Sequence, residues 1–226
     1  MTASARIDAP TPSSLRLVLT LAIAGLISGV AIIGIYEATL PTITANKARE
    51  LREAVFKVLP GVSQMQPLVF RDGELVSSAE PSADDSVVYG GYDDDGKFVG
   101  YAVPGAGPGF QDTIGLIYGF DATRRLVLGM EILESRETPG LGDKIYKDMV
   151  FVDNFKALSI DPTIVTVKKG TRSRPNEVDA ITGATISSKA VVRIINETHA
   201  LWDDKLAAPG AEPPLAVTDA ADGEQQ

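Results

Sequence analysis

Residues Asp179–Thr185 read DAITGAT and run directly into the segment ISSKAVVRIINETHALW. Apolar residues recur at helical spacing there, at Ile186, Ala190, Ile194 and Leu201. This periodicity predicts an amphipathic helix, and Gly183 and Ala184 leave little side-chain bulk where the backbone enters it. We therefore expect a turn that places Thr182 and Thr185 at a helix N-terminus, where free N–H groups and the helix dipole favour an anion.

The same threonines also have a purely structural interpretation. Ser and Thr are common N-cap residues, and a cap needs no ligand. A membrane-anchored binding module without a cofactor, in which DAITGAT is only a capped helix start, therefore stands as an alternative from a different class of function.

The composition excludes several kinds of chemistry. The chain has 226 residues, enough for one sizeable core with appendages, and its net charge of -9 argues against a nucleic-acid role. It has no cysteine, so disulfides, thiolate zinc sites and iron–sulfur clusters are excluded. The single histidine, His199, is expected at the surface of the last helix, and no metal site is predicted. Redox chemistry would require a borrowed cofactor.

The N-terminal part predicts a membrane anchor. Leu17 to Tyr36 is a run of 20 residues without a charge, which is long enough for a helix to cross about 30 Å of hydrocarbon. A cleaved signal peptide usually has an apolar core of only about 7 to 15 residues, so an uncleaved anchor is favoured. Arg6 and Arg16 precede the span, and no Lys or Arg follows it before Lys47. The positive-inside rule then places residues 1–16 in the cytoplasm and everything after the span outside it.

Two further segments flank the expected domain, which covers residues 61–206. Pro41 is expected to break the chain, and residues 37–60 then form a linker that includes an amphipathic helix ended by Pro60-Gly61. Residues 207–226 contain prolines and acidic residues but no basic or aromatic residue. This composition predicts a disordered acidic tail.

The domain itself is expected to be α+β, with a mainly antiparallel twisted sheet flanked by helices. Short apolar runs separated by turn residues predict strands at residues 68–70, 87–92, 98–102, 114–120, 126–133 and 163–168, and a C-terminal helix at about 185–206. The glycine-rich segment PGAGPGF, residues 104–110, is expected to be a loop. Its glycine spacing does not fit a dinucleotide-binding fingerprint.

A second segment of interest reads RETPGLGDKI, from Arg136 to Ile145. Pro139-Gly140 and Gly142 allow a tight turn that can approach a flat ligand, with Leu141 projecting between the glycines. From the spacing alone, an ordinary loop that leads into a helix near Asp143 explains the segment more simply.

The heptapeptide DAITGAT resembles the flavinylation motif Asp-x-x-Ser/Thr-Gly-Ala-Ser/Thr of membrane-anchored flavoproteins. These carry FMN attached through its phosphate to the last hydroxyl residue, which is Thr185 in this chain. With RETPGLGDKI upstream and a single N-terminal span, the chain resembles the G subunit of Rnf-type electron-transport complexes. It is also similar to the C subunit of the sodium-translocating NADH:quinone oxidoreductase.

The resemblance implies roles for particular residues. Thr185 would bear the FMN, Thr182, Gly183 and Ala184 would form the phosphate turn, and Asp179 would belong to the signature recognised by a separate flavin transferase. The flavin ring would be lined by Glu137, Thr138, Gly140 and Leu141. Family members often have a histidine just before that glutamate, whereas this chain has Ser135-Arg136, so any role of that histidine does not transfer.

The resemblance also implies a function and a location. The chain would be an electron-transfer subunit that relays electrons through covalent FMN in a membrane-bound complex coupled to ion translocation, with its FMN domain on the periplasmic side of a bacterial inner membrane. It would work with other membrane subunits rather than as an enzyme on its own. A threonine hydroxyl is a weak nucleophile without an activating base, so attachment by another enzyme is favoured over self-catalysis. A free-standing extracytoplasmic flavin reductase remains a further alternative.

Overall fold

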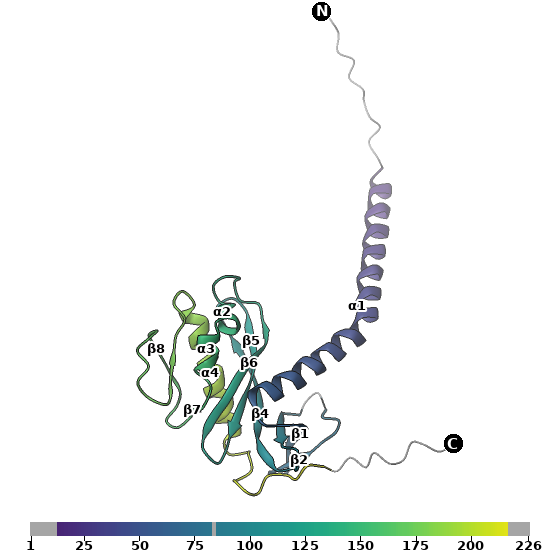
Figure 1. Ribbon diagram of the computed structural model, residues 1–226. Helices are drawn as coiled ribbons and strands as arrows, with labels where there is room; N and C mark the ends of the chain where they lie inside the picture. Colours follow the sequence, from purple (N-terminus) through teal and green to yellow (C-terminus); the bar gives the residue numbers. More distant parts are fainter. Residues whose placement is uncertain (1–12, 83–84, 217–226) are drawn as a thin grey trace, which may run out of the picture. The chain divides into compact units, whose positions relative to one another are not determined.

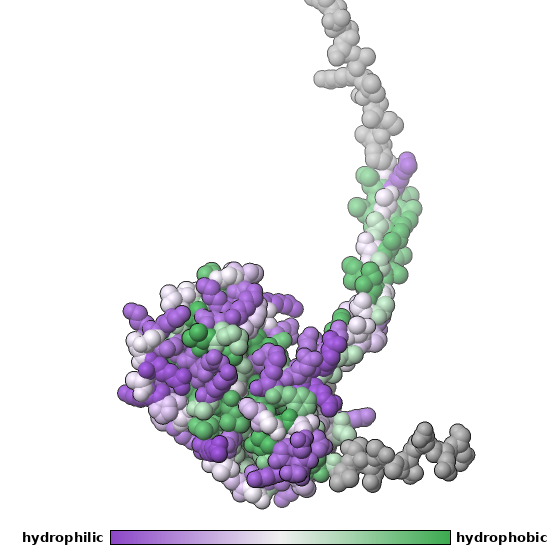
Figure 2. Space-filling model, in the orientation of Figure 1, coloured by the Kyte–Doolittle hydropathy of each residue, from purple (hydrophilic) through white to green (hydrophobic). Residues whose placement is uncertain are grey.

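The computed structural model describes residues 13–82 and 85–216 and divides the chain into two units, residues 1–49 and 50–226. Helix α1 (Ser14–Val58) begins in the first unit. Its apolar stretch is exposed along its length, with Leu21 at 73% and Ile32 at 70% exposure, as the green surface of this helix in Figure 2 shows. This helix has the length and composition to cross a membrane.

The expected chain break at Pro41 is wrong, because α1 continues through that residue without interruption. A proline inside a helix removes one backbone hydrogen bond, and this 45-residue helix keeps its regular turns on both sides of Pro41. The membrane-spanning segment and the segment that reaches the domain therefore belong to one helix.

The domain is built on one antiparallel sheet, which confirms the expected α+β class (Figure 1). Seven strands lie in the order β2-β1-β3-β4-β5-β6-β7. Their bounds are β1 Gln64–Arg71, β2 Glu74–Ser77, β3 Val87–Tyr92, β4 Phe98–Pro108, β5 Thr113–Asp121, β6 Leu126–Ser135 and β7 Leu158–Ser159. The strands predicted from apolar runs before residue 134 lie inside these bounds, whereas the short β2 and β7 were not predicted.

Both faces of the sheet are covered. Helix α4 (Thr185–Trp202) contributes Val191, Ile194 and Ile195 to the larger core, and the last turns of α1 contribute Ala54, Val55 and Val58 to a smaller core on Ala102 and Ile117. Gly119 in β5 permits this second contact, because a Cβ atom there would overlap the backbone carbonyl of Val58.

The segment PGAGPGF is not a loop over most of its length, because β4 runs on to Pro108. Strand β3 pairs with β4 only as far as Ala102, so from Pro104 onward β4 bonds to β5 alone. Proline is tolerated on a strand edge that has no partner for its missing N–H. The expectation of a loop was therefore wrong for a reason that lies in the neighbouring strands.

The elements after β6 position the helix start. Short helices α2 (Lys144–Lys147) and α3 (Met149–Asp153) lead to a parallel pair formed by β8 (Val165–Val167) and β9 (Glu177–Asp179). β9 ends at Asp179, so the DAITGAT turn connects this small sheet directly to α4. The parallel pair thus fixes one side of the turn, and the main sheet fixes the helix behind it.

Two expectations about the C-terminal part are corrected. His199 is buried with 7% exposure, and its ring lies 4.7 Å from the ring of Phe120. The first ten residues of the expected disordered tail, 207–216, follow a defined path. The Tyr92 hydroxyl donates to the carbonyl of Pro213, and Ala216 N–H donates to Gln66 Oε1. Residues 217–226 lie outside the described part of the chain.

Replacing Gly119 by alanine should destabilise the domain, because the new methyl group meets the rigid backbone of Val58. Overpacking of this kind costs about 1–3 kcal/mol in the free energy of unfolding. Gly115 lies in the same strand and has 3.6 Å of clearance to Glu134, so Gly115→Ala is the matched control. Thermal unfolding of the full chain in detergent measures both; equal melting temperatures would contradict this packing.

Candidate functional site

The turn before α4 is closed by hydrogen bonds from within the helix. Ile181 N–H donates to Ser188 Oγ over 3.1 Å, and the Ser188 hydroxyl donates to the carbonyl of Ala184 over 2.9 Å. Gly183 has a φ of +83°, which a residue with a side chain rarely adopts. The turn therefore depends on a glycine in its middle and on a serine one turn into the helix.

The N-terminus of α4 is left without a cap. Ala184 occupies the N-cap position and has no side chain that can accept a hydrogen bond. Within the described residues, the N–H groups of Thr185, Ile186 and Ser187 have no acceptor. The Thr185 side chain is exposed beside them. Free N–H groups and the positive end of an 18-residue helix together form a site that suits a phosphate.

Glu137 connects this helix start to two other segments. Its carboxylate accepts from the Ser187 hydroxyl over 2.6 Å and from the N–H groups of Phe110 and Gln111 over 2.8 and 3.0 Å. The residue is buried, with 5% exposure. One buried charged group thus joins the turn after β4, the segment after β6 and the first turn of α4.

The surroundings of Glu137 keep it ionised. Burial alone would raise its pKa, but hydrogen bonds from Ser187 and from the N–H groups of Gln111 and Phe110 together lower the pKa below its ordinary value. A fixed negative charge therefore lies behind the helix start.

The segment Thr138–Leu141 lies next to Glu137 and faces outward. Gly140 has a φ of +78°, and Leu141 is 49% exposed. Two other apolar side chains are exposed near Glu137. Phe110, whose N–H donates to Glu137, is 60% exposed, and Ile186, which precedes the Glu137 partner Ser187, is 57% exposed. Exposed apolar side chains beside a phosphate site suit a ligand that has a flat apolar ring and an anionic tail.

The predicted site residues lie near the start of α4 and on the segment after β6, and some of them point into the protein rather than outward. The bond between Glu137 and Ser187 joins the segment that continues into Thr138–Leu141 to the first turn of α4, which follows Thr182–Thr185. Thr138 donates its hydroxyl to Gln111 Oε1 over 2.6 Å. Glu137 points inward, so it holds the segment rather than offering its carboxylate to a ligand. One oxygen of Asp179, Oδ1, accepts from the backbone N–H groups of Gly170 and Arg172.

Sequence reasoning missed Ser187 and Ser188, which are both buried in the first turn of α4. A weak signal exists in the sequence, because two adjacent serines interrupt the apolar positions of an otherwise regular helix. Serine within the first turn of a helix often bonds to nearby backbone or side chains.

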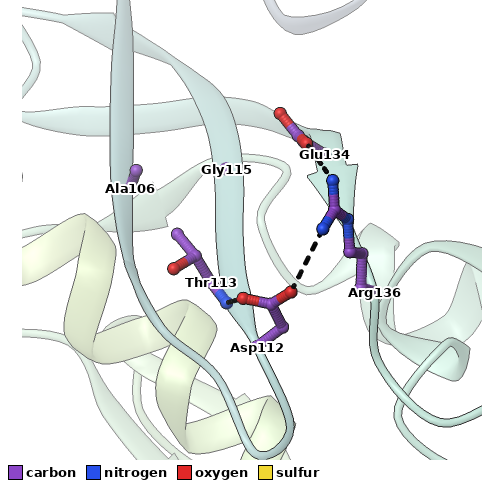
Figure 3. Close-up of a pocket in the computed structure, with 6 residues that line it drawn as sticks. All are labelled: Ala106, Asp112, Thr113, Gly115, Glu134 and Arg136. Atoms are coloured by element: carbon purple, nitrogen blue, oxygen red, sulfur yellow. Dashed lines mark hydrogen bonds and ion pairs between the residues drawn. The ribbon is translucent and has the colours of Figure 1, made fainter. Parts of the chain in front are cut away.

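A hollow of about 250 Å³ lies next to Arg136, where β4 and β6 end and β5 begins (Figure 3). Arg136 reaches there towards Asp112 and Glu134, at 3.8 and 3.9 Å, and its side chain is 74% exposed. Long ion pairs between exposed groups contribute little to stability. Among the described residues no group of three His, Cys, Asp or Glu side chains has the arrangement of a metal site.

The site thus combines the open N-terminus of α4 with an apolar ledge, the exposed segment Thr138–Leu141. An antiparallel sheet that carries such a site and follows a helix long enough to cross a membrane is the pattern of a membrane-anchored domain suited to a phosphate-bearing ligand. Residues 109–200, which contain this site, match the family described as "FMN-binding domain". The fold is similar to the crystal structure of NqrC from Shewanella oneidensis, with a TM-score of 0.53 and 21% identity over 67% of this chain and 91% of that chain.

Curated relatives show which FMN-binding proteins this chain resembles in sequence. The G subunit of the Na⁺-translocating ferredoxin:NAD⁺ oxidoreductase complex of Acetobacterium woodii is 35% identical over 62% of this chain and 68% of its own length. The G subunit of the ion-translocating oxidoreductase complex of Methanosarcina acetivorans is 29% identical over 78% of this chain and 88% of its own. The chain belongs to the family of G subunits of ion-translocating oxidoreductase (Rnf) complexes, and α1 is its membrane anchor.

Replacing Glu137 by glutamine should destabilise the domain by about 1–3 kcal/mol at neutral pH, the usual cost of disturbing a buried hydrogen-bonded group. The pKa of Glu137 is lowered in the folded state, so its stabilising contribution is present above about pH 4.3 and is lost as the pH falls through the folded pKa. The melting temperatures of wild type and Glu137→Gln should therefore differ at pH 7, and the difference should shrink as the pH is lowered below about 4.3. Glu134→Gln, at an exposed carboxylate, is the control. A difference that does not change with pH would contradict the role of the charge.

Proposed function

We propose that this protein is the electron-transfer subunit of an Rnf-type complex and that it relays electrons through FMN attached to Thr185 by a phosphoester bond. The observation that carries the proposal is the uncapped start of α4, where an exposed threonine hydroxyl stands beside N–H groups without acceptors among the residues that the structure describes. The relatives' names support the complex, since they describe subunits of ion-translocating oxidoreductases.

The residues present fit FMN at both of its ends. The N–H groups of Thr185, Ile186 and Ser187 would hold the phosphate, with Thr182, Gly183 and Ala184 shaping the turn. Thr138, Gly140 and Leu141 would lie against the ring. Bound FMN supplies one- and two-electron redox chemistry that no side chain of this cysteine-free protein can provide. The fixed charge of Glu137 keeps the two sets of residues together.

The attachment reaction requires an external base. The Thr185 hydroxyl has one weak hydrogen bond, to the carbonyl of Ile181 at 3.4 Å, and no carboxylate or imidazole of the described residues accepts its proton. A flavin transferase would supply the base and a flavin dinucleotide. The Thr185 oxygen then forms a bond to the FMN phosphorus, and the phosphoanhydride bond breaks. AMP leaves with the electron pair, and the hydroxyl proton passes to the enzyme's base.

The same proposal includes orientation and partners. Basic residues before the apolar run and their scarcity after it favour a cytoplasmic N-terminus, which puts the FMN domain in the periplasm at the inner membrane. The partners would be other membrane subunits of the complex. This assignment is favoured over the C subunit of a quinone reductase, because the curated relatives described above are G subunits and the likeness to NqrC concerns the fold.

Co-expression of the full chain with a flavin transferase should add the mass of one esterified FMN to the intact protein. Thr185→Ala should abolish this increment, since the reacting oxygen is removed, whereas Thr185→Ser should retain it. Thr123→Ala is the control and should keep the increment, because Thr123 is an exposed threonine in the turn between β5 and β6, outside the attachment turn. Intact-mass measurement of the four proteins tests the proposal. An unmodified wild type, or a Thr185→Ala variant that still gains the full increment, would refute it.

A further inference from the structure

A short cationic loop borders the turn that carries Thr185. The cationic loop is residues 168–174, KKGTRSR, which connects β8 to β9. It contains Lys168, Lys169, Arg172 and Arg174 and no acidic residue, in a chain whose net charge is -9. All of its residues are exposed, and Figure 2 shows hydrophilic side chains gathered over this side of the domain, where Figure 1 places β8.

Two carboxylates at the base of the cationic loop hold its backbone. Asp179 Oδ1 accepts from the N–H groups of Gly170 and Arg172 over 3.0 and 3.2 Å. Glu177 Oε2 accepts from the N–H groups of Ser173 and Arg174 over 2.7 and 3.1 Å. Both acids are thereby turned towards the backbone, and the basic side chains are left on the outside. The loop is a fixed feature rather than a loose excursion of the chain.

Most of the positive charge of the loop is not neutralised. Arg174 lies 3.6 Å from Glu177, but Lys168, Lys169 and Arg172 form no ion pair with any of the described residues. Lys169 and Gly170 share a cavity of about 220 Å³ with Asp179, Ala180 and Ile181. The carbonyl of Ile181 accepts the Thr185 hydroxyl. Lys169 therefore lies at the edge of the attachment turn, in a cavity that the carboxylate of Asp148 also lines.

We propose that Lys168, Lys169 and Arg172 attract the phosphate groups of the flavin dinucleotide presented by the transferase, and that Asp179 is the positioning residue that holds them there. This inference rests on the proposed attachment of FMN to Thr185. The incoming group is an anion that must approach an acidic protein, and a local cluster of cations raises its concentration at the right place. Asp179 acts through the two hydrogen bonds it accepts, so its oxygen matters and its charge does not.

The test is the initial rate of flavin attachment to the full chain in detergent, with purified transferase, FAD and Mg²⁺, followed by flavin fluorescence of the denatured protein in a gel. Lys168→Ser/Lys169→Ser should slow attachment by about ten-fold at low salt, the lower end of electrostatic steering. The wild-type rate should fall with added salt, and the rate of the double variant should change little. Lys97→Ser/Arg124→Ser removes two exposed cations from hairpin turns elsewhere and should match wild type.

Substitutions of Asp179 distinguish its role as a hydrogen-bond acceptor that holds the cationic loop from a role of its negative charge. Asp179→Asn keeps an oxygen that can accept from Gly170 and Arg172, so it should keep the wild-type rate of attachment. Asp179→Ala should slow attachment by about ten-fold, as the double lysine variant does, while its melting temperature shows a folded domain. A slow Asp179→Asn variant would overturn the positioning role. A double lysine variant as fast as wild type would overturn the role of the loop.

Binding measurements with the transferase show whether the cationic loop is attracted by the phosphates of FAD or by the surface of the enzyme. In the Thr185→Ala background, which cannot turn over, the chain should bind FAD-loaded transferase more tightly than empty transferase, and the double lysine variant should lose this difference. An equal loss for loaded and empty enzyme would overturn the assignment to the donor phosphates in favour of an acidic enzyme surface. If wild type accepts no FMN at all, the proposed function itself fails; normal attachment with indifferent loop variants refutes only this inference.

Discussion

The hydrogen bonds to the buried carboxylate of Glu137 are the constraint on which the candidate site depends. They join Phe110, Gln111 and Ser187 to the segment after β6, so that three regions far apart in the sequence meet at one group. A buried charge is costly unless it is fully hydrogen-bonded, so the three segments can occupy their positions only together. This one inward-facing group fixes the outward-facing ledge that ends at Leu141 relative to the open start of α4.

The N-terminus of α4 can remain uncapped because of the way the rest of the helix is anchored. The body of the helix is fixed by apolar packing on the sheet, so its N-terminus needs no cap to stay in place. The resulting free N–H groups form a binding site for a phosphate, and the exposed side chain of Thr185 lies beside them. A rigid helix start of this kind suits a tethered cofactor, because the phosphate is held by the protein frame and the ring can meet the ledge beside it.

The sequence predicted the features that depend on contiguous residues and missed those that depend on distant ones. The apolar span, the main strands and the turn before Thr185 follow from local spacing, and the structure agrees with them. The extension of β4 through Pro104 depends on where the neighbouring β3 ends, and the path of the tail depends on Gln66 and Tyr92. The inward direction of Glu137 depends on a serine 50 residues later, which no local pattern indicates.

The central claim is that one hydroxyl, Thr185, carries the flavin, and fragmentation of a single proteolytic peptide tests it most directly. Trypsin does not cleave Arg174 before Pro175, so it releases Ser173–Lys189, which contains Thr182, Thr185 and three serines. Tandem mass spectrometry of this peptide from the native membrane protein should locate one phosphoester-linked FMN on Thr185. A bare peptide, or FMN on Thr182 or on any of the serines, would contradict the account.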